Sequence, residues 1–465
     1  MRRLLLLGFH GAFRLDGWMR RRFTPSGRWV LGTGFGALVW GINTHATLSY
    51  QLLTLAVALV GLAVLAAPSF RARFTARRHL PRYATAGAPA RYTVELRSHS
   101  RRAQRGLRLM DVLCATPPPT AELQRRPAGR AEGHNWFDRR VGYPRWVQAM
   151  RHRLGGRLDP APVPELGPQG VARVRIELLP ERRGFIQFGR LRVLRSDPLG
   201  LFNAETRCGE GERLLVLPRR YPVNWRAWSG GARARLGGSS ESASVGGSQE
   251  YAASREYRPG DPLRLIHWRS WARLGVPVVK EFHDECFVRH ALVLDTALPG
   301  DAGSVRFEEA VSVAASFAAS APSEEGVVEL LFVGADTYCV DAGPGIGSNA
   351  VMLEALACAR PAAAQRFALL ASTVLAHAVD LNACVLVLLA WDAPRRALVS
   401  RLRECGVESL VLVISEGNPA AESGALQGRA DRVRVLRCGR VASDLEHSGL
   451  AGSGAHPAHP AADAA

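Results

Sequence analysis

Residues 290–298, which read HALVLDTAL, open the part of the sequence that decides the fold. An unbroken apolar run precedes Asp295, as in a strand that is buried on both faces. Comparable apolar runs and helix-length apolar patterns alternate further along the chain, at 307–319, 327–333, 351–359, 383–390, 395–405 and 409–414. Strand and helix in this alternation predict a mostly parallel, doubly wound sheet with helices on both faces.

Upstream of this α/β part, residues 85–220 show the two-residue alternation of half-buried strands. Examples are YTVEL at 92–96 and VARVRIEL at 171–178, and Pro and Gly separate such runs. We therefore expect a β-sandwich-like domain. Residues 116–170 are rich in Pro, Arg and Gly without periodicity, which predicts a long insertion loop or a partly ordered excursion.

The N-terminal part predicts a membrane anchor. Residues 29–42 are apolar or small, a polar NTH sequence interrupts them, and residues 46–67 then form an apolar run of about the 20 residues that a bilayer requires. We expect a transmembrane hairpin of two helices over 29–67, in which Gly32 and Gly36 let the helices pack closely. One span plus a buried or interfacial segment is the alternative.

Arginines flank this hairpin on both sides and are absent from its turn. They are Arg20, Arg21, Arg22 and Arg28 before it, and Arg71, Arg73, Arg77 and Arg78 after it. Because basic flanks stay in the cytoplasm, we expect a multi-pass protein of the bacterial inner membrane with both termini and the soluble domains in the cytoplasm. The basic segment 1–28 mixes apolar residues with arginine, a composition suited to anionic membrane lipids.

Composition limits the classes of function. The net charge of this 465-residue chain is +19, but Lys280 is the only lysine among 60 basic residues. The charge therefore reflects arginine usage, and we expect no nucleic-acid partner. The eight cysteines are spread singly, without a CxxC pair or a neighbouring histidine at metal-ligand spacing, and we interpret them as buried thiols in a reducing compartment.

Two polar segments mark the remaining boundaries. Residues 230–247 are rich in Gly and Ser and are expected to form a linker, and residues 446–465 are expected to form a disordered tail. The predicted α/β domain covers 286–445, and the segment 250–285 precedes it. The whole is an α+β multidomain chain: a transmembrane hairpin, a β-sandwich, then a doubly wound α/β domain.

The segment 250–285 reads EYAASREYRPGDPLRLIHWRSWARLGVPVVKEFHDE. A Pro-Gly turn at 259–260 precedes Asp261, a strong N-cap, and Gly275 suits the position after a helix end, so we predict a helix over 262–274. Arginines and carboxylates crowd this segment: Arg255, Arg258, Arg264, Arg269 and Arg273, with Glu250, Glu256 and Asp261. They form either ion pairs that hold the helix on the following sheet, or a surface for an anionic group or acidic partner.

The same segment resembles a bacterial family, number 58 of the domains of unknown function. The resemblance is carried by Arg255, Glu256, Tyr257, Arg258, Pro259, Gly260 and Asp261, followed by Arg264, Ile266, His267, Trp268, Ala272 and Arg273. Two upstream motifs agree: RRGF with FG at 182–189, and DPLGLF at 197–202 followed by VLPR at 216–219. The resemblance implies a membrane hairpin, an α/β part similar to a von Willebrand factor A domain, and a MoxR-type AAA+ ATPase as partner.

A von Willebrand A-type metal site takes Asp-x-Ser-x-Ser after the first strand, a threonine from a second loop and an aspartate after a later strand, all oxygen ligands suited to hard cations. Asp295 and Asp392 stand at two of these positions, but Ala297 and Pro299 supply no side-chain oxygen. We therefore expect no bound cofactor. Mg²⁺ or Ca²⁺ in a degraded site of Asp295, Thr296 and Asp392 is the alternative.

The sequence contains no GxSxG, GxxxxGK[ST] or HExxH motif, and no GxGxxG after a strand. His267 falls on the flank of the predicted helix, where a packed, hydrogen-bonded histidine is commoner than an acid–base catalyst. We expect no enzymatic activity, and a membrane-tethered adaptor or assembly protein for cell-envelope or other complexes. A metal-dependent von Willebrand A-type binding module and an outward-facing cell-envelope hydrolase are the alternatives.

Overall fold

The computed structural model describes residues 2–40, 47–67, 70, 72–118, 142–225, 249–258, 261, 263–284, 288–298, 305–321, 326–334, 337–343, 348–416 and 433–451. Contacts divide the chain into two units, Met1–Arg219 with Leu353–Ala359, and Arg220–Met352 with Arg360–Ala465. Each unit is described by itself. The predicted linker at 230–247 lies outside the described residues.

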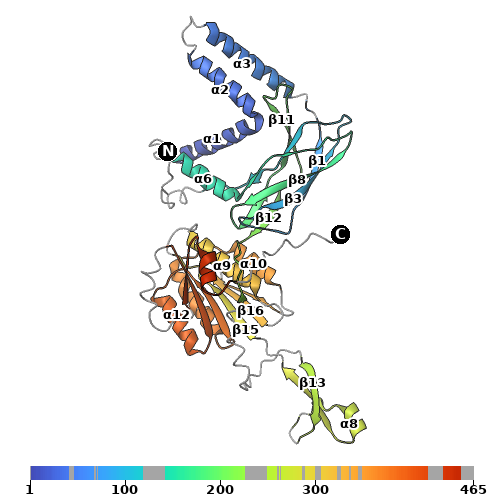
Figure 1. Ribbon diagram of the computed structural model, residues 1–465, viewed down its shortest axis with the longest axis vertical. Helices are drawn as coiled ribbons and strands as arrows, with labels where there is room; N and C mark the ends of the chain where they lie inside the picture. Colours follow the sequence, from blue (N-terminus) through green and yellow to red (C-terminus); the bar gives the residue numbers. More distant parts are fainter. Residues whose placement is uncertain are drawn as a thin grey trace. The chain divides into compact units, whose positions relative to one another are not determined.

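Three helices begin the first unit: α1 (Arg2–Arg22), α2 (Pro25–Trp40) and α3 (Thr47–Ala66). Among the described helices, α3 alone is long and apolar enough to cross a bilayer, over Leu48–Ala66. Helix α2 runs beside α3 (Figure 1). Gly34, not the expected pair Gly32 and Gly36, makes the close approach, because a Cβ at Gly34 would lie 3.0 Å from the Ala56 Cβ whereas the other two glycines face open space.

The DPLGLF loop joins these helices to the β-rich part of the unit. The Phe23 ring, between α1 and α2, packs edge-on against Phe202 with centroids 5.1 Å apart. Asp197 Oδ1 accepts the N–H groups of Leu201 and Phe202, each at 2.7 Å, and so shapes the loop. A Cβ at Gly27 would lie 2.0 Å from the Leu201 carbonyl oxygen, so only glycine permits this contact.

The β-rich part contains three four-stranded sheets, in the orders β1-β3-β8-β6, β11-β10-β4-β7 and β2-β12-β9-β5. The strands are β1 (Phe74–His79), β2 (Tyr83–Thr85), β3 (Ala90–Ser98), β4 (Leu107–Met110), β5 (Leu113–Cys114), β6 (Gly156–Leu158), β7 (Ala161–Pro162), β8 (Val171–Pro180), β9 (Gly184–Phe188), β10 (Leu191–Ser196), β11 (Asn203–Cys208) and β12 (Glu212–Leu217). All three sheets contribute to one hydrophobic core. Burial alternates strictly along β8, as predicted from its sequence.

The predicted insertion at 116–170 is more regular than expected where the structure describes it. Residues Tyr143–Leu154 form α6. Strand β6 is an edge strand of the first sheet, and β7 is an edge strand of the second. Glycines with positive φ, Gly142 and Gly155, flank the helix, and Trp146 is fully buried. The apolar Trp146, Ala149 and Met150 at helical spacing were the available sequence signal.

A buried ion pair lies in the core of the β-rich part. Arg78 donates to both carboxylate oxygens of Asp111, at 2.8 and 2.7 Å, and both side chains are fully buried. Tyr92 donates to the same carboxylate at 2.7 Å, and the Arg78 guanidinium also donates to the carbonyls of Glu210 and Gly189. Arg78 is therefore a core residue, and its expected role as a flanking charge of the hairpin is wrong.

The second unit contains a six-stranded sheet in the order β17-β16-β15-β18-β19-β20, parallel throughout except for β17. Its strands are β15 (Val288–Leu294), β16 (Gly326–Val333), β17 (Thr337–Ala342), β18 (Ala383–Leu388), β19 (Glu408–Ser415) and β20 (Val433–Arg437). Its sequence neighbours are α9 (Val305–Ser320), α10 (Asn349–Cys358), α11 (Phe367–His377), α12 (Ala393–Glu404) and α14 (Val441–His447). The predicted mostly parallel sheet is confirmed (Figure 1).

The helices cover this sheet on both faces. On one face, α11 and α12 pack against alternate residues of the strands and form one buried cluster with them. Helix α9 contacts β15, β18 and β19 and contributes no residue to that cluster. The chain stays ordered beyond the expected boundary at 446, because Leu450 is buried and Ala451 pairs with Val223. The tail residues 452–465 lie outside the described residues.

Replacing Arg78 by methionine should destabilise the β-rich part by about 3–5 kcal/mol, because it leaves the Asp111 carboxylate buried without its partner. Amide hydrogen exchange in peptides from β3 and β8 measures the effect. The matched control is Glu177→Ala, which breaks the Arg91–Glu177 pair, whose side chains are 76% and 56% exposed. It should cost at most about 1 kcal/mol, and equal effects of the two changes would contradict the assignment.

Candidate functional site

The family-like segment folds as a small module around an antiparallel pair, β13 (Gln249–Glu256) and β14 (Val278–Asp284). Between them lie a 3₁₀ turn, η3 (Leu263–Leu265), and the short helix α8 (Trp268–Leu274). The predicted helix over 262–274 is therefore wrong in its first half. Ile266 is buried and forms a bridge with Val279, and the His267 N–H donates to the Val278 carbonyl at 2.8 Å, which interrupts the helix.

Asp261 is not the expected N-cap, because its carboxylate is held by an arginine. Arg255 donates to both oxygens, at 2.7 and 2.8 Å, and the Arg258 N–H donates at 2.9 Å. The hydrogen bonds from Arg255 and then from Arg258 lower the pKa of Asp261 to about 2. Arg255 and Asp261 thus form an ion pair across the loop between β13 and η3. We call this ion pair the clasp.

The other predicted residues of the module divide into packed and exposed ones. His267 caps α8 and its Nδ1 lies 2.6 Å from the Ser270 hydroxyl, as expected for a structural histidine. The Tyr257 N–H donates to the Pro277 carbonyl at 2.9 Å, and Glu256 is exposed at the end of β13. Gly260 lies outside the described residues.

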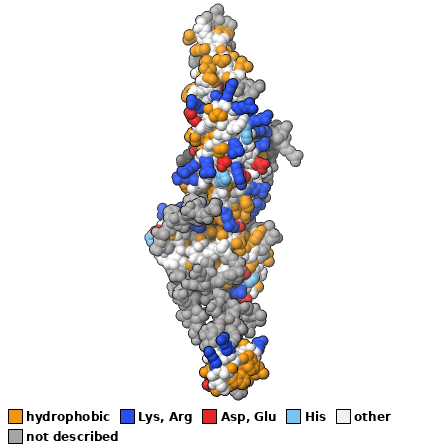
Figure 2. Space-filling model, turned by 90° about the vertical axis from the view of Figure 1, so that its right-hand side faces the viewer, with side chains coloured by type: hydrophobic (Ala, Val, Ile, Leu, Met, Phe, Trp, Pro, Cys, Tyr) orange, Lys and Arg blue, Asp and Glu red, His pale blue; other side chains and the backbone are white. Residues whose placement is uncertain are grey.

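The module exposes large apolar side chains, and several arginines lie near them in the sequence. Leu263, Trp268 and Leu274 are 67%, 65% and 65% exposed, and the Trp268 ring stacks on Trp271. The exposed arginines of the same stretch are Arg258, Arg264, Arg269 and Arg273. Figure 2 shows apolar and basic side chains gathered at the bottom of the view, in the part where Figure 1 labels α8. We call these three apolar and four basic residues the signature face.

The predicted metal residues lie at the carboxyl end of the parallel strands. Asp295 follows β15 and Asp392 follows β18, the neighbours between which the strand order reverses, where open α/β sheets usually bind ligands. Asp295 is fully buried, and its oxygens accept the N–H groups of Ala297 at 2.9 Å and Leu389 at 3.1 Å. The sequence therefore placed the two carboxylates at the correct end of the sheet.

An arginine that was not among the residues predicted from the sequence joins the two carboxylates. Arg395 donates through Nε to Asp295 at 2.7 Å, through one terminal nitrogen to Asp392 at 2.5 Å, and through the other to the Ala297 carbonyl at 2.9 Å. Its guanidinium also lies 4.5 Å from the centre of the Phe367 ring. The signal was the spacing of Asp392, the N-cap of α12, three residues before an arginine on the same helix.

The resulting charge arrangement does not fit a divalent ion. Burial raises the pKa of Asp295, while Arg395 and the two backbone donors oppose that rise. Both Asp295 oxygens act only as acceptors, so we assign the ionised form, paired with the guanidinium. The Thr296 hydroxyl donates to the Val333 carbonyl and is thereby engaged away from the carboxylates. The Arg395 guanidinium occupies the position from which a metal ion would have to contact both aspartates.

Mg²⁺ should not change the melting temperature of the wild-type protein, because the Arg395 guanidinium already lies between the two carboxylates and pairs with both. Arg395→Ser should destabilise the α/β domain by about 3–5 kcal/mol, since two acidic groups then lack their cation. Millimolar Mg²⁺ should partly restore the melting temperature of that variant. The control, Arg401→Ser, changes an exposed arginine on the same helix. A rise with Mg²⁺ in the wild type would show that the ion binds despite the arginine.

Comparisons with known proteins address the family. The sequence profile described as "Protein of unknown function DUF58" matches residues 253–422. No curated protein matches the chain. The solution NMR structure of the CARDB domain of PF1109 from Pyrococcus furiosus covers 31% of this chain and 94% of its own, at 9% identity and a TM-score of 0.17, too low to support a conclusion about fold or function. The matched residues 253–422 contain most of the module and five of the six strands of the α/β sheet, and this part of the chain is therefore assigned to the DUF58 family.

Proposed function

We propose that this protein is a membrane-anchored adaptor that binds a partner protein through the signature face and has no catalytic activity of its own. The observation that carries the proposal is the exposure of Leu263, Trp268 and Leu274 beside several arginines. Tryptophan and arginine are the residue types that most often dominate binding energy in protein interfaces. Clustered apolar exposure of this kind is typical of interaction sites.

The partner that we propose is a MoxR-type AAA+ ATPase, with assembly or remodelling of cell-envelope or other protein complexes as the joint task. The family resemblance supplies the identity of this partner. The exposed Arg264, Arg269 and Arg273 favour an acidic surface on it, since opposite charges steer association and fix the register of docking. The clasp supports such a surface because Arg255 and Asp261 close the loop that leads into α8.

We further propose that the α/β domain is von Willebrand factor A-like. Its strand order, with one antiparallel edge strand, corresponds to the doubly wound order 3-2-1-4-5-6. Asp295 and Asp392 stand where the aspartates of such a metal site would be. Because Arg395 pairs with both, the metal-dependent binding module is the weaker alternative.

The proposed location is the cytoplasmic membrane, with the soluble domains in the cytoplasm. Helix α3 supports an anchor, and α2 packed beside it supports the hairpin. Arginines at the start of this region, Arg20 to Arg22 and Arg28, support the orientation. The docking of Phe23 on Phe202 would keep the β-rich part close to the same side of the membrane.

The partner assignment predicts the result of crosslinking and affinity purification from native membranes. The double variant Leu263→Ser, Trp268→Ser should recover the ATPase more than about tenfold less well than the wild type, as expected for loss of an interface hot spot. Leu179→Ser, at an exposed leucine of β8, should leave recovery unchanged. Equal recovery with both variants would place the contact elsewhere, and absence of an ATPase from the wild-type sample would reject the partner.

The orientation predicts how reporters fused after Ala465 behave. Green fluorescent protein should fluoresce there, and alkaline phosphatase should stay inactive, because both flanks of the hairpin are basic. Activity of the phosphatase fusion alone would place the soluble domains outside the cytoplasm. That outcome would reject the adaptor in its proposed form and favour the cell-envelope hydrolase.

A further inference from the structure

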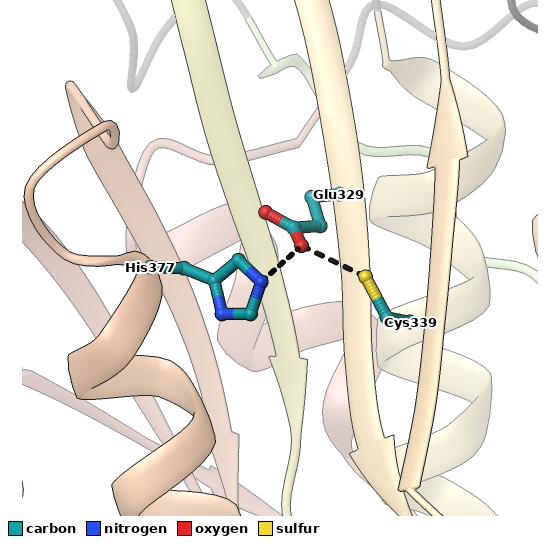
Figure 3. Close-up of side chains that lie close together, drawn as sticks. All are labelled: Glu329, Cys339 and His377. Atoms are coloured by element: carbon teal, nitrogen blue, oxygen red, sulfur yellow. Dashed lines mark hydrogen bonds and ion pairs between the residues drawn. The ribbon is translucent and has the colours of Figure 1, made fainter.

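Three potential metal ligands that are distant in sequence meet beside the α/β sheet: Glu329 of β16, Cys339 of β17 and His377 at the end of α11 (Figure 3). The Cys339 Sγ lies 2.8 Å from Glu329 Oε1, and the His377 Nε2 lies 3.4 Å from the same oxygen. All three donor atoms lie within 4.8 Å of one another. The cluster lies beside the amino-terminal half of β16, where Glu329 pairs with Ala291 of β15, and so away from Asp295.

Strand register and helix packing bring the three residues together. In the antiparallel pair of β16 and β17, Glu329 lies opposite Asp341, and Leu331 lies opposite Cys339. Directly opposed residues project to the same face, and residues two apart share a face, so Cys339 and Asp341 both lie on the side of Glu329. Helix α11 packs on this face and contacts β16, which places its last residue over Glu329.

The hydrogen bonding of His377 prepares Nε2 as a ligand. Nδ1 lies 2.8 Å from the Thr373 carbonyl oxygen, which can only accept, so Nδ1 carries a proton. The other ring nitrogen, Nε2, points at the Glu329 carboxylate and is the atom that can coordinate an ion beside it. Metal-binding histidines typically donate their other N–H to a backbone carbonyl or carboxylate in this way.

The cluster is accessible, and its cysteine is not an activated thiol. The side chains of Glu329 and His377 are 10% and 39% exposed, and Cys339 is exposed. Burial of the sulfur, followed by its hydrogen bond to Glu329, raises the pKa of Cys339 to about 12. The metal-free thiol therefore stays protonated at neutral pH, unlike the low-pKa thiols of redox sensors.

We propose that Cys339 Sγ, Glu329 Oε1 and His377 Nε2 form a binding site for a borderline-soft divalent metal ion, of which Zn²⁺ fits best. Sulfur, nitrogen and oxygen donors in one site select zinc over Mg²⁺ or Ca²⁺. Bonds of about 2.0–2.3 Å around a tetrahedral ion put its ligands about 3.3–3.8 Å apart, so the donors need to move by only about 1 Å. Binding converts Cys–SH to a metal-bound thiolate and releases one proton to solvent.

The fourth position is open to water or to a neighbouring carboxylate. Asp341 Oδ1 lies 3.9 Å from the Cys339 Sγ on the same strand face. The ion would join β16, the antiparallel edge strand β17 and the end of α11. An ion that binds only the folded state stabilises it once the concentration of free ion exceeds the dissociation constant. This edge of the sheet would therefore become more resistant to unfolding. The site is independent of the proposed partner.

Cobalt substitution in the full-length, detergent-solubilised protein tests the site directly. After chelation and removal of the chelator, titration with Co²⁺ should give a thiolate-to-cobalt absorption band that saturates at one equivalent and disappears on addition of Zn²⁺. Cys339→Ser should abolish the band, and His377→Ala should weaken metal binding at least tenfold. Zn²⁺ should also raise the melting temperature of the wild type and not that of Cys339→Ser.

Matched controls separate the site from adventitious binding. Cys405→Ser removes another exposed thiol, and His447→Ala removes a histidine whose Nδ1 also lies against a carbonyl one turn back, that of Ser443. Both should bind Co²⁺ as the wild type does, and circular dichroism in metal-free buffer should show that all variants are folded. No thiolate band in the wild type, or a band that survives Cys339→Ser, would overturn the proposal.

Discussion

The arrangement at the carboxyl end of the α/β sheet depends on one guanidinium. Asp295 directly follows β15 and is fully buried, and Asp392, whose side chain is 45% exposed, caps α12 after the neighbouring strand β18. Without a cation between them these two like charges would repel each other. Arg395 lies between them and also donates to the Ala297 carbonyl, so one side chain connects the loop after β15 to the start of α12. Its donors replace the coordination that a metal ion would provide. The geometry of this end of the sheet is therefore fixed by the chain itself.

A second arginine–carboxylate pair has a different physical role. Asp295 is fully buried, whereas Arg255 and Asp261 lie near the surface of the module, with side chains 38% and 16% exposed. Solvent screens such a pair, so it adds little to the free energy of folding. What it does is shape the loop, because both Asp261 oxygens and the Arg258 N–H are engaged at once. That loop leads into the helix that exposes Trp268.

Sequence periodicity predicted what is local, and it failed where partners come from distant strands. The parallel sheet and the alternation along β8 followed from apolar patterns, and Gly275 ends α8 with a positive φ as predicted. The break at Ile266 could not be predicted, because its cause is a bridge to Val279. The sequence shows no histidine close to a cysteine for the same reason, since the pairing of β17 and the packing of α11 bring His377 near Cys339.

The aspartate motif by itself did not predict the role of Arg395, which pairs with both aspartates. Ala297 and Pro299 supply no side-chain oxygen, so the sequence predicted no tight metal site, but it did not show which group balances the charge of Asp295 and Asp392. Asp295 is fully buried, and a buried carboxylate without a partner would be unstable, so this position requires a compensating cation. On α12, an arginine three residues after the N-cap Asp392 can reach back across the first turn to both aspartates. Where a sequence has the aspartates of such a motif without its other oxygen ligands, a basic residue is therefore expected in the first turn of the adjoining helix.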